Sequence, residues 1–121
     1  MQFSEKVALV TGGSQGIGAA ICQRFAAQGA KVAVVACSDR GKAQIVVDAI
    51  EKDNGNAKAC ACDVANVAEI DALVADVLAA FGRIDILVNS AGVFYPTLIG
   101  ETDEAMFDRM CDINLKGTFF M

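Results

Sequence analysis

Apolar residues fall in four short, nearly unbroken runs. Longer segments separate these runs, and in them apolar residues recur every three or four positions. The runs are rich in β-branched side chains and have too few polar residues to alternate between core and solvent, which is typical of strands buried on both faces. We therefore expect four buried strands, at Val7–Thr11, Lys31–Ala36, Ala57–Cys62 and Ile84–Val88.

The first two intervening segments have the period of amphipathic helices. Residues 16–28 predict a helix that stops at Gly29, a residue suited to a helix C-terminus. Its expected buried face consists of Ile17, Ile21 and Phe25. The next helix ends at the turn Asn54-Gly55, and its expected buried face consists of Ala43, Val46, Val47 and Ile50.

Asn66 is placed to cap a third helix, and Glu69, three residues later, completes a pair typical of a capping box. This helix ends at Gly82, and its expected buried face consists of Val67, Ile70, Val74, Val77, Leu78 and Phe81. A loop containing the only proline follows the fourth strand. The segment Thr102-Asp103-Glu104 then opens a fourth helix toward the C-terminus.

Strand and helix thus alternate four times, which predicts an α/β fold. Buried parallel strands joined by right-handed crossovers give a doubly wound parallel sheet of the Rossmann type, here with about four βα units. We expect residues 1–121 to form one domain. In such sheets ligands bind beyond the carboxyl ends of the strands.

Composition narrows the function classes. The net charge is −5 without a basic cluster, so nucleic-acid binding is not expected. Charged residues interrupt every apolar run, so no membrane span is expected. The start MQFSEK lacks the pattern of a signal peptide, and we expect a cytoplasmic protein.

The five cysteines lie in apolar segments, which predicts small buried side chains in a reducing compartment. The spacing of Cys60 and Cys62 is C-x-C, and the chain has no histidine to complete a zinc site, so we expect no metal. The cysteines are Cys22, Cys37, Cys60, Cys62 and Cys111.

A glycine-rich turn, TGGSQGIG, joins the first strand to the first helix. Gly12, Gly16 and Gly18 are spaced G-x-x-x-G-x-G, unlike the commoner G-x-G-x-x-G fingerprint. Glycines let a diphosphate approach the backbone, and the free N–H groups of a helix N-terminus face the anion. The alternative is a glycine-rich connection that binds no ligand.

TGGSQGIG resembles the TGxxxGxG motif of the short-chain dehydrogenase/reductase family, at the same place near the N-terminus. The resemblance implies an oxidoreductase that transfers hydride between a nicotinamide cofactor and a carbonyl or secondary alcohol substrate. It implies that the cofactor contacts in this turn are Gly12, Ser14, Gln15, Gly16, Ile17 and Gly18.

Two further segments at strand ends carry the resemblance. Asp63-Val64 stands where the family has an aspartate that hydrogen-bonds the adenine amino group, followed by a helpful backbone N–H. The alternative is an ordinary turn aspartate. The segment NSAG resembles the family's NNAG motif with Ser90 in place of the second asparagine, and it implies cofactor contacts at Asn89, Ala91 and Gly92. A plain loop is the alternative.

Asn114, in INLKGTFF, resembles the family's catalytic asparagine, which holds a water at a helix bend. A solvent-facing asparagine is the alternative. After the second strand, Ser38 and Arg40 could bind the 2′-phosphate of NADP, whereas Asp39 opposes one, and no acidic residue stands at Ala36 or Cys37 to select NAD. Gln15 stands where many NADP-using members carry arginine. The balance favours NADP over NAD.

The family's catalytic Ser and Tyr-x-x-x-Lys follow its asparagine by a few tens of positions. Here the only tyrosine is Tyr95, and Ile99 stands four residues after it. We therefore expect a chain truncated before the catalytic segment, with a reductase of the 3-oxoacyl-carrier-protein type as the parent enzyme. Sugar-alcohol and steroid dehydrogenases share these motifs. A non-catalytic dinucleotide-binding or interaction fragment is the alternative, and the family implies a homo-oligomer, dimer or tetramer.

Overall fold

The computed structural model describes residues 1–121. Its strands are β1 (Val7–Thr11), β2 (Lys31–Ala36), β3 (Asn56–Ala61) and β4 (Ile86–Asn89). Its helices are α1 (Gly16–Ala27), α2 (Arg40–Lys52), α3 (Val67–Phe81), α4 (Glu104–Cys111) and α5 (Thr118–Phe120), with a π-helical segment, η1 (Asp112–Gly117), between the last two. No helix is at once long enough and apolar enough to cross a membrane.

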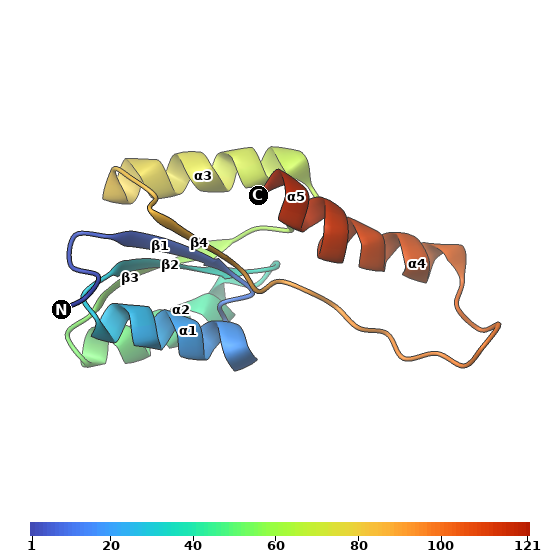
Figure 1. The fold of residues 1–121 in the computed structure, drawn as a ribbon, viewed down its shortest axis with the longest axis horizontal. Coiled ribbons are helices and arrows are strands. Elements are labelled where there is room, and N and C mark those ends of the chain that lie inside the picture. Colours follow the sequence, from blue (N-terminus) through green and yellow to red (C-terminus); the bar gives the residue numbers. More distant parts are fainter.

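The four strands form one parallel sheet in the order β3-β2-β1-β4. The chain moves outward from β1 to β3, then crosses back to place β4 on the other side of β1. The strand order therefore reverses at β1, as in a doubly wound fold, and this confirms the predicted fold class. Figure 1 shows α3 on one side of the sheet and α1 and α2 on the other.

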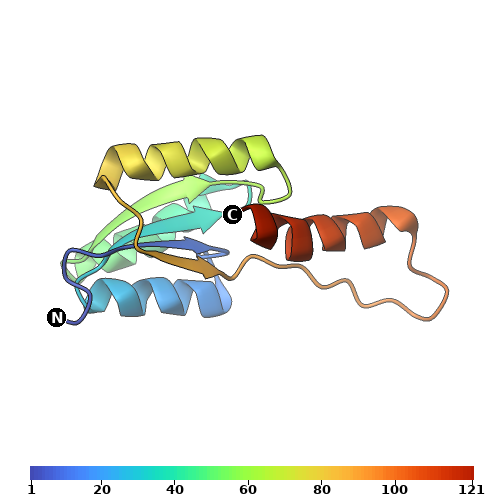
Figure 2. The ribbon, with the colours of Figure 1, turned by 45° about the horizontal axis from the view of Figure 1, so that its top comes forward.

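Alternate residues of each strand enter two separate cores, because successive side chains of a strand point to opposite faces. On one face, Val32 and Val34 of β2 pack with Cys22 of α1 and Val46 of α2. On the other face, Leu9, Val35 and Cys60 pack with Ile70 of α3 and Ile113 of η1. The sheet thus lies between two layers of helices, as the turned view also shows (Figure 2).

The buried face of α1 is one position further along the chain than the predicted face. Ile17 is 77% exposed, and Ile21 and Phe25 are only partly buried. The buried residues are instead Gly18, Cys22 and Ala26. Close approach of α1 to the turn after β1 explains this difference at Gly18: a Cβ there would lie 2.0 Å from the Gly12 carbonyl oxygen, so only glycine fits.

The buried face of α2 agrees with the prediction, whereas that of α3 agrees only in part. Ile70 and Val77 are buried, but Leu73 replaces the predicted Val67 and Leu78, which are exposed. The stripe of large apolar residues on α3 is wider than the face that contacts the sheet, and only the part that faces the sheet becomes buried.

The predicted strand bounds shift at β3 and β4, and β4 is not buried on both faces. Its residues alternate between half-buried and exposed, and Leu87 is 42% exposed. β4 lies at an edge of the sheet, paired only with β1. The outer edge of β4 therefore has no neighbouring strand, and its apolar side chains are partly exposed to solvent.

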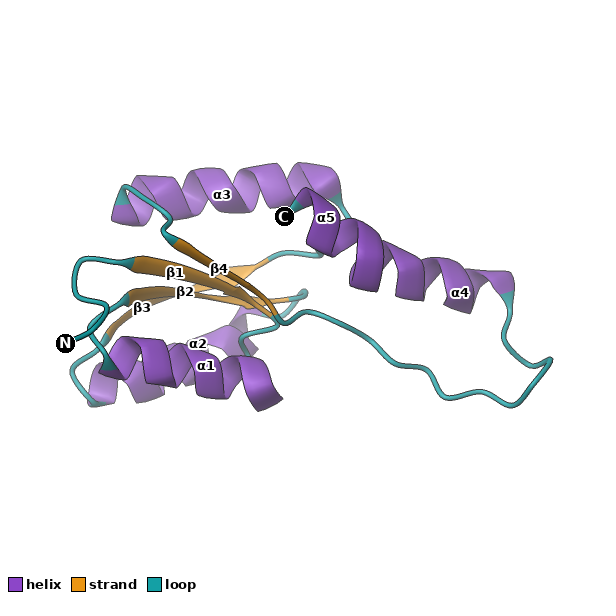
Figure 3. Ribbon diagram, viewed as in Figure 1, coloured by secondary structure: helices purple, strands orange, loops and turns teal.

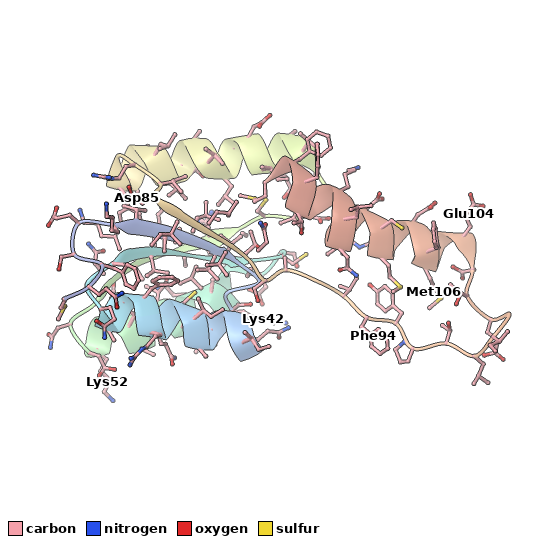
Figure 4. All side chains as sticks on the ribbon, in the orientation of Figure 1. Lys42, Lys52, Asp85, Phe94, Glu104 and Met106 are labelled. Atoms are coloured by element: carbon pink, nitrogen blue, oxygen red, sulfur yellow. The ribbon has the colours of Figure 1, made fainter.

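The loop after β4 and the helix α4 extend beyond the sheet. Figure 3 shows a long loop running out from the end of β4 and α4 returning along it toward α3. Figure 4 places Phe94 on this loop and Met106 on α4, opposite it. Asp103 caps α4 by accepting the Met106 N–H at 2.8 Å, so the predicted opening of this helix is confirmed.

Candidate functional site

A cavity lies at the carboxyl ends of the strands, around the switch point at β1. Its volume is about 390 Å³, within the range of small-molecule sites. Segments from all parts of the chain line it: the turn after β1, the ends of β2 and β3, the loop after β4, and η1. The lining residues are Thr11, Gly12, Ser14, Gln15, Gly16, Ile17, Gly18, Val35, Cys37, Cys62, Asp63, Val64, Ser90, Ala91, Gly92, Val93 and Ile113.

Two glycines let neighbouring backbone segments approach closely at the floor of the cavity. Gly12 has φ +62°, and a Cβ there would lie 2.6 Å from the Ser90 carbonyl oxygen. Gly18 would place a Cβ against the Gly12 carbonyl oxygen. Only glycine satisfies these contacts, so the turn, the start of α1 and the loop after β4 form one compact unit.

Gly16 differs from these two glycines. Its φ is +54°, and a Cβ built on it would meet no atom within 4 Å. Gly16 lines the cavity, so the space beside its Cα is open to whatever enters. A bulky group can therefore approach the backbone at the N-terminus of α1.

The N-terminus of α1 also has free hydrogen-bond donors. The first bond of this helix is donated by Ala19 N–H to the Gln15 carbonyl, and the N–H groups of Gly16, Ile17 and Gly18 have no acceptor within the chain. Gln15 makes no side-chain cap. By contrast, side-chain oxygens cap the other long helices. They belong to Asp39 in α2, Asn66 in α3 and Asp103 in α4, and they accept the N–H groups of Gly41, Glu69 and Met106. Uncapped N–H groups beside open space are suited to an anion.

The hydroxyl of Thr11 joins the glycine turn to the loop after β4. Its oxygen accepts the N–H groups of Ser90 and Ala91, each at 3.2 Å, and donates to the Val88 carbonyl at 3.4 Å. Thr11 is the one buried polar residue of the core. It thus fixes the position of the NSAG segment at the rim of the cavity.

Asp63 lies two residues after the end of β3, and its carboxylate accepts two hydrogen bonds. Its Oδ1 accepts the Ala65 N–H at 3.0 Å, and its Oδ2 accepts from Nη1 of Arg109 in α4 at 3.2 Å. This hydrogen bond raises the pKa of the Arg109 guanidinium. Asp63 makes the turn contact that any aspartate could make there, and in addition it faces the cavity and a cation.

Asn114 lies in η1, and its side chain is engaged on both sides by one backbone residue. Its Oδ1 accepts the Val93 N–H at 2.8 Å, and its Nδ2 donates to the Val93 carbonyl at 2.8 Å. The amide thus holds the loop after β4 against the helix. η1 has the i→i+5 hydrogen bonds of a π-helix, and π-helical turns are frequent at functional sites.

Comparisons with known proteins agree with this geometry. Residues 6–121 match the family described as short chain dehydrogenase. The chain belongs to that family. A galactitol 2-dehydrogenase of Agrobacterium fabrum is 46% identical over 121 residues, which are 100% of this chain and 46% of that protein. A 3-oxoacyl-acyl-carrier-protein reductase of Staphylococcus aureus is 39% identical over 114 residues, 94% of this chain and 46% of that protein.

A solved structure, described as a metagenomic short-chain oxidoreductase in complex with NADP, superposes with a TM-score of 0.92 at 38% identity. It matches over 99% of this chain and 54% of that one. The chain thus spans about half the length of the short chain dehydrogenases that it matches. The resemblance drawn from TGGSQGIG is confirmed at the level of the family.

Most of the predicted cofactor contacts of this family member come together in the cavity. Four predicted site residues lie outside its lining. Ser38 is exposed after β2, and Arg40 lines a separate groove with Lys58 and Glu69 at the free edge of β3. Asn89 pairs with Thr11 in the sheet, and Asn114 lies behind Val93.

Other lining residues were not predicted from the sequence. Thr11 and Ser90 lie inside the quoted motifs, so strand register could have identified them. The other lining residues lie in apolar segments whose pattern indicates only burial. They are Val35, Cys37 and Cys62 at strand ends, Val93 in the loop after β4, and Ile113 in η1.

The cysteines divide into two groups. Cys22, Cys60 and Cys62 are buried, and burial raises the pKa of the Cys22 thiol to about 12 and that of Cys62 to about 11. Cys37 is exposed and Cys111 half-buried. The prediction that all five are buried is therefore wrong for Cys37, because β2 ends at Ala36 and the next residue faces the cavity.

Proposed function

We propose that this protein binds a nicotinamide dinucleotide in the cavity at the carboxyl ends of β1, β2 and β4, and that it serves hydride transfer between the cofactor and a carbonyl or secondary alcohol. The observation that carries the proposal is the uncapped N-terminus of α1. Three N–H groups without acceptors face a space that Gly16 leaves open. A diphosphate supplies the negative charge and the acceptors that these donors lack.

The residues of the cavity fit the rest of such a cofactor. Asp63, with the following Val64, would hold the adenine end, and Ala91 and Gly92 would let the chain pass close to a ribose. When bound, the nicotinamide ring would give or accept the hydride. The chain's own residues bind and orient the cofactor, and the buried strand ends below it exclude water from one side.

We propose NADP in preference to NAD. No carboxylate stands at the end of β2, where Ala36 is followed by Cys37. Asp39 is the nearest acid, and its Oδ1 accepts the Gly41 N–H at 2.9 Å as the cap of α2. This engagement leaves Asp39 less able to accept a ribose hydroxyl. The similar metagenomic oxidoreductase was solved in complex with NADP, and Ser38 and Arg40 remain the proposed phosphate contacts beyond the rim.

We propose for Asn114 the role that the resemblance implies, a catalytic asparagine at a helix bend. Its position in η1 and its paired bonds to Val93 support a rigid placement. The relatives include both a polyol dehydrogenase and a 3-oxoacyl-carrier-protein reductase. The proposed substrate is therefore a small carbonyl or secondary alcohol, and the reductase type of substrate is the narrower form of this proposal.

We also propose a cytoplasmic homo-oligomer, dimer or tetramer. The five free cysteines suit a reducing compartment. Large apolar side chains are exposed along α4, η1 and α5, where Phe107, Leu115 and Phe119 are each more than half exposed. Light scattering on the purified protein measures the mass of the assembly, and a monomer at micromolar concentration would contradict this part of the proposal.

The cofactor proposal is tested by replacing Gly16 with valine. A branched side chain at this position fills the space proposed for the diphosphate, so we expect calorimetric binding of NADP to be lost. Gly82→Val is the matched control. Gly82 also has positive φ, at +81°, and also has no atom near its Cβ, but it ends α3 away from the cavity. Equal NADP affinity of the Gly16 and Gly82 variants would refute the proposed site.

A further inference from the structure

Arg109 reaches from α4 to the end of β3 and is the only cation that contacts Asp63. The pair is separated by 46 positions in the chain, with 3.2 Å between Nη1 and Oδ2. Both side chains are partly exposed, 40% for Arg109 and 30% for Asp63. An ion pair with this much solvent contributes little to folding.

The helix that carries Arg109 is held firmly beside Asp63. Arg109, Ile113 and Gly117 follow one another at intervals of four, about one helical turn. Ile113 is buried in one core cluster with Val64. A Cβ on Gly117 would lie 2.7 Å from Cγ2 of Val64, so the backbone of η1 touches this residue. The face of the helix that bears Arg109 is thus pressed against the residue next to Asp63.

Arg109 completes the immobilisation of the Asp63 carboxylate. The bond from Ala65 N–H fixes Oδ1, but a carboxylate held at one oxygen can still turn about its last side-chain bond. The guanidinium fixes Oδ2 as well. Each oxygen keeps a second lone pair for a further donor. The carboxylate is therefore oriented in advance, with acceptor capacity left toward the cavity that it lines.

We propose that Arg109 is a positioning residue for adenine recognition: it holds Asp63 so that its carboxylate accepts from the amino group of the adenine ring. This inference rests on the proposed function, because it needs the dinucleotide to occupy the cavity. The helix α4, which leads to Asn114 in η1, would then also determine how strongly the cavity prefers adenine over other bases.

Nucleotide discrimination gives the direct test. We would measure by calorimetry the binding of NADP and of its hypoxanthine analogue, in which a carbonyl oxygen replaces the adenine amino group. A carboxylate rejects that oxygen, so the protein should favour NADP by about tenfold or more, the effect of one hydrogen bond to a charged group. In Arg109→Met this preference should fall to about threefold or less.

Two further variants separate positioning from structure. Arg24→Met is the matched control, since Arg24 also lies in the last turn of a helix but makes no ion pair. It should keep the full preference. Arg109→Lys retains a cationic donor and should keep part of it. In an Asp63→Ala background, Arg109→Met should leave the ratio of the two dissociation constants unchanged, because the carboxylate that it positions is absent.

The outcomes are distinct. An unchanged preference in Arg109→Met, or an equal weakening of both nucleotides, overturns the positioning role and leaves the proposed function standing. A protein that binds NADP without discriminating against the analogue also overturns it. A protein that binds neither nucleotide overturns the proposed function and this inference together. If Arg109→Met fails to fold, as seen in its circular dichroism, the uncharged variant Arg109→Gln decides: full retention of the preference contradicts the proposal.

Discussion

Replacing Thr11 with valine removes a single hydroxyl and keeps the shape of the side chain. The oxygen that is lost accepts the N–H groups of Ser90 and Ala91, each at 3.2 Å, in a residue that is 1% exposed. A buried donor left without an acceptor costs about 1–3 kcal/mol. Both donors lie at the rim of the cavity, where water replaces part of the lost bonding, so we expect a total loss of about 2 kcal/mol.

Chemical and thermal unfolding measure this loss. For a domain of this size, about 2 kcal/mol lowers Tm by roughly 6–8 °C. Thr11→Ser is the control because it keeps the hydroxyl and removes only a methyl group, which costs about 1 kcal/mol. The valine variant should therefore be less stable than the serine variant. If Thr11→Val stays within about 0.5 kcal/mol of the parent while Thr11→Ser is less stable, the hydroxyl does not hold the NSAG loop.

Three other perturbations test the fold and the site. Gly117→Ala places a Cβ 2.7 Å from Cγ2 of Val64, and it should lower the free energy of unfolding by about 1–3 kcal/mol in urea unfolding. The control, Lys116→Ala at the exposed neighbour, should change this free energy little. Equal stability of the two variants would show that η1 can shift. The bonds from Arg83 and from the Val7 N–H hold the pKa of Asp85 below 3.8, so its stabilisation is present above about pH 4 and is lost as pH falls through the lowered pKa. Asp85→Asn should therefore show a shallower loss of stability than the parent between about pH 5 and pH 3, and parallel pH profiles would contradict this. A brief maleimide treatment read by mass spectrometry should label the exposed Cys37 before the buried cysteines, with NADP slowing the labelling, and no protection by NADP would argue against a cofactor beside that thiol.

The sequence alone determined the elements and their kind. Buried parallel strands have to be apolar on both faces, and helices on a sheet have to be apolar on one, so β1, β2 and the buried face of α2 could be predicted from periodicity. Asn66 could be predicted as a cap, and Thr102-Asp103-Glu104 as a helix start, because capping is a contact within four residues. The glycine turn could be located because glycine spacing is a local property of the backbone.

The tertiary structure alone decided which of several apolar residues becomes buried and which polar residues meet. Gly18 is buried in place of the predicted Ile17 because the start of α1 packs too closely on the turn after β1 for a side chain. The run that forms β4 is half exposed because it has a neighbour on one side only. The pairing of Asp63 with Arg109 spans 46 positions, and no local pattern contains it. The residues within one segment determine whether it forms a helix or a strand. Contacts between distant segments depend on how the helices pack on the sheet.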